Sequence, residues 1–263
     1  MRDFCAAKYR RLCVALVDAG YQSLTLADYF QSGGLPLEAR RVILRHDIDR
    51  FPGMAIPLAR IERELGLRAT YHVRVPATFN PAVIRTLAEL GHEVGFHYEN
   101  LSKSRGELVR ARQGFADDLA QLRTLCEVKT VSMHGSPASR IDNRDLWRSR
   151  SGIDDGLLGE AYLDMDYRTV LYYSDTGRTW QEGRFNIRDH IPDGQSRITG
   201  APVVRTTDDL IDLIAREGRN LYLVAHPERW PVSPGGWALA GLKDLAFNWA
   251  KVLIRKSYAI RTR

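Results

Sequence analysis

The chain has 263 residues, 44% of them hydrophobic and 27% charged, which is the composition of an ordinary globular protein with room for one large α/β domain. No apolar run approaches the length of a membrane span, and the charged N-terminus lacks the layout of a secretory signal, so we expect a cytoplasmic protein. The formal net charge is +6 and Arg far outnumbers Lys. Arg side chains suit phosphate and carboxylate groups, but here they are scattered and form no basic stripe interleaved with aromatic residues, so we expect no nucleic-acid partner.

Hydrophobic periodicity and turn residues predict strands alternating with helices along most of the chain. A helix over 4–19 and a short helix near 26–30 form an N-terminal helical extension at 1–40. Strand-then-helix units follow, with strands predicted at 41–46, 69–75, 92–98 and 129–134, and helices at 54–65, 81–90 and 105–125. Successive units of this kind indicate parallel strands joined by right-handed crossovers.

The pattern loosens after Gly135. Residues 136–200 are rich in Asp, Arg, Gly and Trp, and we expect loops on the substrate side there, with short strands at 160–163, 170–174 and 184–188. A helix at 207–216, a strand at 221–225 and a final helix at about 237–255 complete the prediction. No repeat or linker interrupts the chain, which predicts one domain over 1–263.

Two acidic residues follow the first predicted strand, which runs into the sequence RHDIDR at 45–50. Asp47 and Asp49 are two positions apart, so on an extended segment they point the same way. Neighbouring carboxylates repel, and a divalent metal ion between them is a common solution, with one carboxylate as ligand and the other as a base. The alternative is a solvated pair of acids in a turn that caps the next helix.

Three histidines also lie at the ends of predicted strands, namely His97, His134 and His226. Sites in parallel α/β folds form at the carboxyl edges of the strands, so all three are candidate ligands or proton carriers. Each has a structural alternative, such as a core histidine or a hydrogen bond within a turn. His226 stands out, because an apolar strand delivers it in HPERW, with Trp230 as an aromatic wall.

The order of these motifs resembles the polysaccharide deacetylase family of metal-dependent carbohydrate deacetylases. The matching features are the DxD at 47–49, GHEVGFH at 91–97 and a strand-terminal His near the C-terminus, over about 41–230. The resemblance implies a single-domain, distorted (β/α)7–8 barrel of the type shared by glycoside hydrolases and deacetylases. It also implies that Asp47 is the catalytic base, Asp49 and His97 are metal ligands, and His226 is the general acid.

The sequence departs from the family in the second motif, GHExGxHxxxH, whose last His is a metal ligand. Position 101, where that His belongs, is Leu101. His134 and Glu99 are the available replacements. We favour His134, because one Asp and two His form a facial set that leaves positions open for water and substrate. The implied cofactor is a divalent metal ion, with zinc expected and nickel or cobalt as alternatives.

Substrate-binding residues are predicted around this edge. The candidates are Arg74, Glu99, Arg140 and Trp230. The segments at 162–168 and 173–180, which combine acidic, Arg and aromatic residues, are expected over the mouth of the site and suit sugar hydroxyl or phosphate groups. The alternative for these segments is a loop held by its own ion pairs.

The expected function is a hydrolase that removes an N-acetyl or other N-acyl group from a sugar or glycan, such as a nucleotide- or lipid-linked sugar in surface polysaccharide synthesis. One alternative is a hydrolase of another non-peptide C–N bond, and another, suggested by Leu101, is a metal-free barrel that only binds glycan. The basic tail also leaves open peripheral docking on an anionic membrane. Its residues are Lys251, Arg255, Lys256, Arg261 and Arg263.

Overall fold

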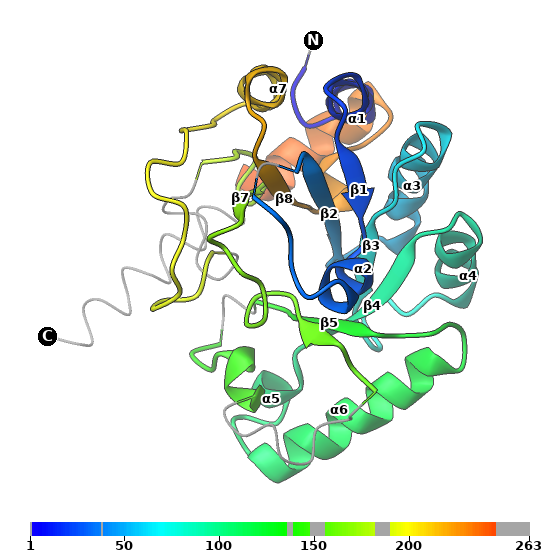
Figure 1. The fold of residues 1–263 in the computed structure, drawn as a ribbon. Coiled ribbons are helices and arrows are strands. Elements are labelled where there is room, and N and C mark those ends of the chain that lie inside the picture. The colour runs from blue at the N-terminus through cyan, green and yellow to red at the C-terminus, as the bar shows by residue number, and fades with distance from the viewer. Residues whose placement is uncertain (1, 38, 136–138, 148–155, 182–189, 246–263) are drawn as a thin grey trace, which may run out of the picture.

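A curled sheet of parallel strands runs through the centre of the molecule, with helices along its outside (Figure 1). The computed structural model describes residues 2–37, 39–135, 139–147, 156–181 and 190–245. Neighbouring strands follow the order β6-β5-β4-β3-β2-β8-β7, and β1 pairs with the first half of β2. The strands are β1 Gln22–Leu24, β2 Arg41–Ile48, β3 Thr70–Val73, β4 Glu93–Tyr98, β5 Thr130–Met133, β6 Gly159–Glu160, β7 Val170–Ser174 and β8 Asn220–Ala225.

Every pairing is parallel, and β2 to β6 follow one another both in sequence and in space. Within the described residues, β6 and β7 are not paired with each other, so the sheet forms a half-barrel rather than a closed one. This confirms the parallel α/β class predicted from sequence and is compatible with a (β/α) barrel. It also brings the carboxyl ends of the strands to one edge.

The helices begin where the sequence supplies caps. Asn80 accepts hydrogen bonds from the backbone of Ala82 and Val83, with Pro81 as the first residue of α4, and Thr206 and Asp209 form a capping box on α7. The helices are α1 Ala6–Asp18, α2 Leu26–Gln31, α3 Ala55–Glu64, α4 Pro81–Glu89, α5 Asn100–Lys103, α6 Leu108–Arg123 and α7 Thr207–Arg216, with short 3-10 turns at Pro52–Met54, Asn143–Trp147 and Pro227–Arg229. Residues 234–245 are also helical. No helix in the described part of the chain combines the length and apolar character that crossing a bilayer requires.

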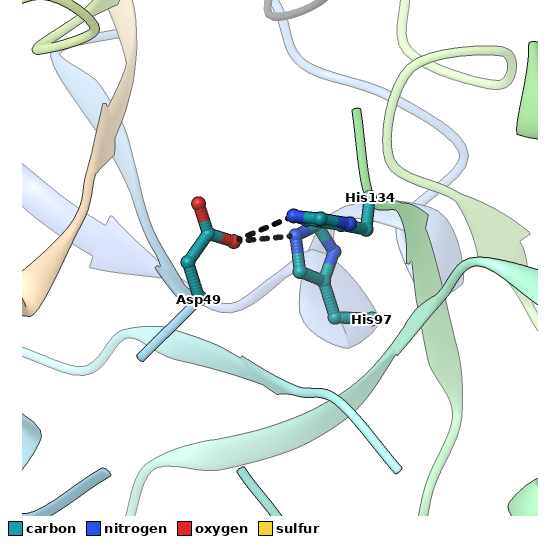
Figure 2. Close-up of side chains that lie close together, drawn as sticks. All are labelled: Asp49, His97 and His134. Atoms are coloured by element: carbon teal, nitrogen blue, oxygen red, sulfur yellow. Dashed lines mark ion pairs between the residues drawn. The ribbon is translucent and has the colours of Figure 1, made fainter. Parts of the chain in front are cut away.

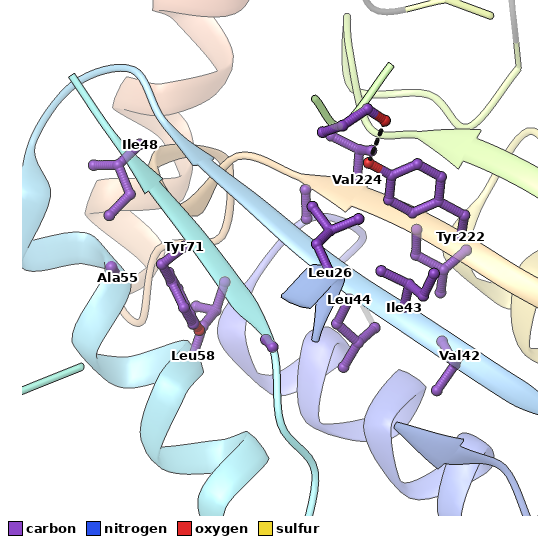
Figure 3. Close-up of a cluster of buried hydrophobic side chains, with 14 of the residues drawn as sticks. Leu26, Val42, Ile43, Leu44, Ile48, Ala55, Leu58, Tyr71, Tyr222 and Val224 are labelled. Atoms are coloured by element: carbon purple, nitrogen blue, oxygen red, sulfur yellow. Dashed lines mark hydrogen bonds between the residues drawn. The ribbon is translucent and has the colours of Figure 1, made fainter. Parts of the chain in front are cut away.

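Strand β2 is buried on both faces and divides the core in two (Figure 3). On the helix side, Leu44 and Ile48 are buried among residues such as Leu58 of α3. On the inner side, Arg45 Nη1 donates to the hydroxyl of Tyr222 at 3.0 Å. A strand buried on both faces explains why 41–48 reads as a nearly continuous apolar run until Arg45.

Several boundaries differ from the prediction. The first strand extends to Ile48, so Asp47 lies inside β2 rather than beyond it. The long helix predicted at 105–125 is shorter, and a separate α5 precedes it, because Gly106 at φ 88° breaks the helical path. The strand predicted at 160–163 is only Gly159–Glu160. The strand predicted at 184–188, residues 246–255 of the final helix and the basic tail lie outside the described residues.

Candidate active site

Asp49, His97 and His134 come together at the carboxyl edge of the sheet (Figure 2). Asp49 follows β2, His97 lies in β4 and His134 directly follows β5. One potential ligand atom from each lies within 4.8 Å of the other two. Asp49 Oδ1 is 3.3 Å from His97 Nε2 and 3.5 Å from His134 Nε2. The structure therefore gathers the three residues that the sequence predicted as metal ligands.

The neighbours of the two imidazoles decide which ring nitrogen carries the proton. His97 Nδ1 donates to the carbonyl oxygen of Ser132 at 3.0 Å, and His134 Nδ1 donates to Glu99 Oε2 at 2.9 Å. In a neutral imidazole the opposite nitrogen, Nε2, then carries a lone pair. Both Nε2 atoms face Asp49 Oδ1, a buried oxygen that accepts no hydrogen bond in the described part of the chain. With both imidazoles neutral, three electron-rich atoms face one another, an arrangement that a cation stabilises.

The spacing of these atoms fits a divalent metal ion. In a tetrahedral zinc site with bonds of about 2.1 Å, neighbouring ligand atoms lie roughly 3.4 Å apart. The separations of 3.3 and 3.5 Å from Asp49 Oδ1 to the two imidazole nitrogens match this value. Hydrogen bonds from the non-coordinating ring nitrogens to a carbonyl and a carboxylate are the usual means of orienting metal-binding histidines. The residues present therefore fit a metal ion held by one Asp and two His.

Glu99 and Arg74 hold the cluster from behind through hydrogen bonds to His134 and to the backbone of Asp49. Arg74 Nη2 lies 2.8 and 2.9 Å from the two oxygens of Glu99, and Arg74 Nη1 donates to the backbone carbonyl of Asp49 at 2.9 Å. Burial raises the pKa of Glu99, but His134 and Arg74 outweigh burial and lower it below its usual range, so Glu99 is ionised. The contacts place Glu99 beside Nδ1 of His134, on the side away from Asp49, and the prediction that Arg74 and Glu99 bind substrate stays a prediction.

Leu101 plays no part in the cluster. It lies in α5 with 4% of its surface exposed and belongs to the hydrophobic core. The parallel pairing of β4 with β5 places His97 opposite Ser132, two residues before His134. His134 consequently reaches the edge of the sheet beside His97 from the neighbouring strand and brings a third potential ligand atom to the cluster.

Asp47 points to the same region as Asp49, as predicted, but it is fully buried and ion-paired. Both of its oxygens accept hydrogen bonds from Arg45, at 2.9 and 2.5 Å. Asp47 Oδ2 lies 3.8 Å from His97 Nε2, and Oδ1 lies 3.5 Å from His72 Nδ1. Burial raises the pKa of Asp47, but Arg45 and His97 outweigh burial and hold it well below its usual range. Asp47 is therefore a carboxylate at neutral pH.

His226 approaches the cluster from the opposite side and is held by Asp175. His226 Nε2 is 3.9 Å from Asp49 Oδ2, while His226 Nδ1 is 2.6 Å from Asp175 Oδ1. Burial and Arg229 lower the pKa of His226, but the carboxylates of Asp175 and Asp49 outweigh them and raise it to about 9. His226 is therefore protonated at neutral pH and presents a proton to the cluster.

Sequence reasoning missed Asp175 as a member of the site. Burial raises the pKa of Asp175, but Arg229 and His226 lower it to about 2. Arg229 Nη1 donates to Asp175 Oδ1 at 2.7 Å, and Trp230 Nε1 donates to Oδ2 at 2.8 Å. A signal was present, because Asp175 directly follows the predicted strand 170–174, just as Asp49 and His134 directly follow β2 and β5 in the structure. The mixture of acidic, Arg and aromatic residues at 173–180 predicts a substrate loop instead and does not single out Asp175.

The other two predicted substrate residues differ in burial. Trp230 has 0% of its surface exposed, and its ring packs near Phe4, Tyr9 and Trp180. The prediction that Trp230 forms a substrate wall is therefore wrong, because its indole is in the core and its N–H is used by Asp175. Arg140 is exposed, in the described stretch 139–147.

A scan of the chain against protein-family models gives no match, and a search of the curated proteins also gives none. The function is therefore inferred from the residues and their geometry.

Proposed function

We propose that the chain is a metal-dependent hydrolase that removes an N-acyl group from a sugar, on a barrel of the deacetylase type. One observation carries the proposal: the Nε2 atoms of His97 and His134 lie 3.3 and 3.5 Å from Asp49 Oδ1, a buried oxygen that accepts no hydrogen bond among the described residues. The resemblance to polysaccharide deacetylases in the motifs at 47–49 and 91–97 and in His226 supports the choice of reaction.

Asp49, His97 and His134 are the residues that hold the metal, for which zinc is the first choice. When bound, such an ion polarises the acyl carbonyl and lowers the pKa of a water molecule. Asp47 is ionised because Arg45 pairs with it, and its Oδ2 lies 3.8 Å from His97 Nε2, at the edge of the cluster. It is the carboxylate placed to accept the proton of the attacking water.

His226 carries out the second proton transfer. The amine of an amide is too basic to depart without a proton, so an acid must supply one. The carboxylate of Asp175 raises the pKa of His226 and so favours the protonated ring. Asp175 fixes the ring through Nδ1, which leaves Nε2 directed at the cluster, 3.9 Å from Asp49 Oδ2. His226 Nε2 then donates its proton to the departing amine.

A mass-spectrometric assay tests the reaction. Zinc-loaded protein is incubated with a panel of N-acylated sugars that are free, nucleotide-linked or lipid-phosphate-linked. We expect the mass loss of one acyl group from at least one substrate, and a rate on the order of 10²- to 10⁴-fold lower for His226→Gln. His190→Gln is the matched control, because His190 is not among the residues gathered at the site.

Other outcomes separate the alternatives. Turnover that is unchanged in both His226→Gln and Asp49→Asn would refute the proposed site. Glycan binding without turnover and without metal would assign the chain to the metal-free binding class. Release of the product from a cyclic amide, with no action on any acylated sugar, would assign it to another C–N hydrolase.

A further inference from the structure

The helix at 234–245, which is orange in Figure 1, is fixed to the rest of the molecule along one side. Trp237 Nε1 donates a hydrogen bond to the backbone carbonyl of Asp3 at 2.7 Å. Asp244 is buried, and its two oxygens lie 3.7 Å from Arg178 and 3.9 Å from Arg229. Trp237 and Asp244 are seven residues apart, which is nearly two helical turns, so they lie on the same side of the helix. This is the side that packs against the rest of the molecule.

The opposite side of the helix exposes large apolar side chains. Leu239, Leu242 and Leu245 are 54%, 66% and 56% exposed. At about 100° of rotation per residue, Leu239 and Leu242 lie roughly opposite Trp237, and Leu245 is the neighbour of Leu242 one turn further on. The solvent side of a helix ordinarily carries polar residues, and apolar side chains grouped on it mark a surface that binds something.

Positive charge accompanies these leucines. Lys243 is exposed, and its Nζ lies 4.7 Å from the centroid of the Phe51 ring, which is itself 54% exposed. Asp244, the one acidic residue in the sequence of 234–245, is on the buried side. The exposed patch formed by Phe51, Leu239, Leu242, Lys243 and Leu245 therefore combines apolar side chains with a cation, and the carboxylate of the helix faces away from it.

The residues that follow this helix in the sequence carry most of the net charge of the chain. Residues 246–263 contain five basic residues and no acidic one, namely Lys251, Arg255, Lys256, Arg261 and Arg263. Since the whole chain has 38 Lys and Arg and 32 Asp and Glu, residues 1–245 keep 33 and 32, a net charge of +1. Lys251 is six residues after Leu245, so at most about 22 Å of extended chain separates the two.

The surface of an anionic lipid bilayer matches both the patch and the basic segment. Leucine and aromatic side chains next to Lys and Arg are typical of segments that lie at a membrane surface, with the apolar side chains at the acyl chains and the cations at the headgroups. Each Lys or Arg close to an anionic bilayer strengthens binding by about fivefold. A second copy of the chain would also cover the leucines, but it would bring five further cations to the same place, where like charges repel.

We infer that the exposed patch and the basic segment at 246–263 dock the protein on the surface of an anionic lipid bilayer, with Leu239, Leu242 and Leu245 in contact with the lipid. The inference goes beyond the proposed hydrolysis and is independent of it, because docking of this kind requires neither the metal ion nor an acylated sugar.

Sedimentation of the full chain with lipid vesicles tests the inference. Vesicles of phosphatidylcholine mixed with phosphatidylglycerol are compared with vesicles of phosphatidylcholine alone. We expect binding to the anionic vesicles to be at least about tenfold tighter at low salt, and most of this difference to disappear at about 1 M salt, where the Debye length is only about 3 Å. Equal binding to both kinds of vesicle, or binding to neither, would overturn the inference.

The leucines are tested with Leu242→Glu combined with Leu245→Glu. Both side chains are more than half exposed, so the fold tolerates the change, and two carboxylates at the lipid contact are expected to weaken vesicle binding at least about tenfold. Val109→Glu combined with Val203→Glu is the matched control, because these residues are 77% and 68% exposed and lie outside the patch. Equal weakening in the two double variants would overturn the role of the leucines.

The basic segment is tested by Lys251→Gln, Arg255→Gln and Lys256→Gln together, which we expect to weaken binding to anionic vesicles roughly 100-fold. The control removes the same charge elsewhere with Arg11→Gln, Arg168→Gln and Arg216→Gln, whose side chains are 52%, 70% and 79% exposed, and it should cost less than about fivefold. Equal losses in the two triple variants would overturn the role of the segment. A dimer in analytical ultracentrifugation that Leu242→Glu dissociates, without vesicle binding by the wild type, would assign the patch to a second copy and overturn the membrane.

Discussion

Asp47, in β2, and Asp49, directly after it, are two residues apart and point to the same region, yet they have different counterions. Arg45, two residues before Asp47 on the same face, pairs with Asp47, whereas the imidazoles of His97 and His134 face Asp49. The repulsion expected between two adjacent carboxylates is therefore relieved separately for each. The alternation of side chains on a strand already placed Arg45 on this face, so the sequence contained the information.

Removal of Arg45 tests how strongly the fold depends on this pair. Arg45→Leu leaves a buried carboxylate without its partner, and we expect the free energy of unfolding to fall by about 3–5 kcal/mol in urea denaturation. Arg168→Leu is the control, because Arg168 pairs with Asp166 at the surface, and it should cost no more than about 1 kcal/mol. Equal losses in the two variants would show that the buried pair has no special role.

The link between Asp175 and His226 makes stability depend on pH. The pKa of His226 is raised to about 9, above the ordinary value of about 6.5. The pair therefore stabilises the folded chain fully below pH 6.5, and this contribution is lost as the pH rises through 9. In chelator-treated protein, we expect the free energy of unfolding to fall between pH 7 and pH 9.5, and Asp175→Asn to remove most of that fall. The same fall in the wild type and in Asp175→Asn would contradict a stabilising interaction between Asp175 and His226.

At the scale of elements, the glycine inside GHEVGFH is explained by the strand beside it. A Cβ on Gly95 would lie 2.5 Å from Cδ2 and 2.7 Å from Nε2 of His72, and 3.0 Å from the carbonyl oxygen of Thr130. The imidazole of His72 is fully buried in β3 next to Asp47. Only a residue without a side chain allows β3 and β4 to pair with His72 in this position.

A double-mutant cycle tests that packing. Gly95→Ala should destabilise the chain by about 1–3 kcal/mol, because a methyl group overpacks the space beside His72. In a His72→Ala background the same substitution should cost clearly less, since the clashing ring is gone. Equal losses in the free energy of unfolding in the two backgrounds, measured by chemical denaturation, would assign the clash to the carbonyl oxygen of Thr130 instead.

Strands were predictable where apolar runs were bounded by turn residues. Of the strands with residues that carry the site, β2, β4, β5 and β8 lie within two residues of their predicted ends. The predicted helix boundaries were wrong where a backbone conformation ended the helix, as at Gly106, whose φ of 88° separates α5 from α6. The strand predicted at 160–163 is longer than β6, because sequence periodicity does not show that β5 pairs with just two residues of β6 in the described part of the chain.

At the scale of the whole molecule, the parallel sheet brings side chains from distant parts of the chain to one edge. Asp49, His97, His134, Asp175 and His226 all lie at the carboxyl ends of strands. Strand ends and the resemblance identified four of these five residues from sequence. The roles of Arg74, Glu99 and Trp230 were not predictable in this way, because each depends on which neighbour its polar group contacts in three dimensions.

The metal content of purified protein, measured by mass spectrometry after dialysis against micromolar zinc, is the most direct test of the site. We predict about one ion per chain for the wild type and almost none for Asp49→Ala, His97→Ala or His134→Ala. Glu99→Gln should retain the ion with roughly 10- to 100-fold lower affinity, since Glu99 only orients His134. A wild-type protein that takes up no metal, or a His134→Ala variant that binds zinc as tightly as the wild type, would contradict the account.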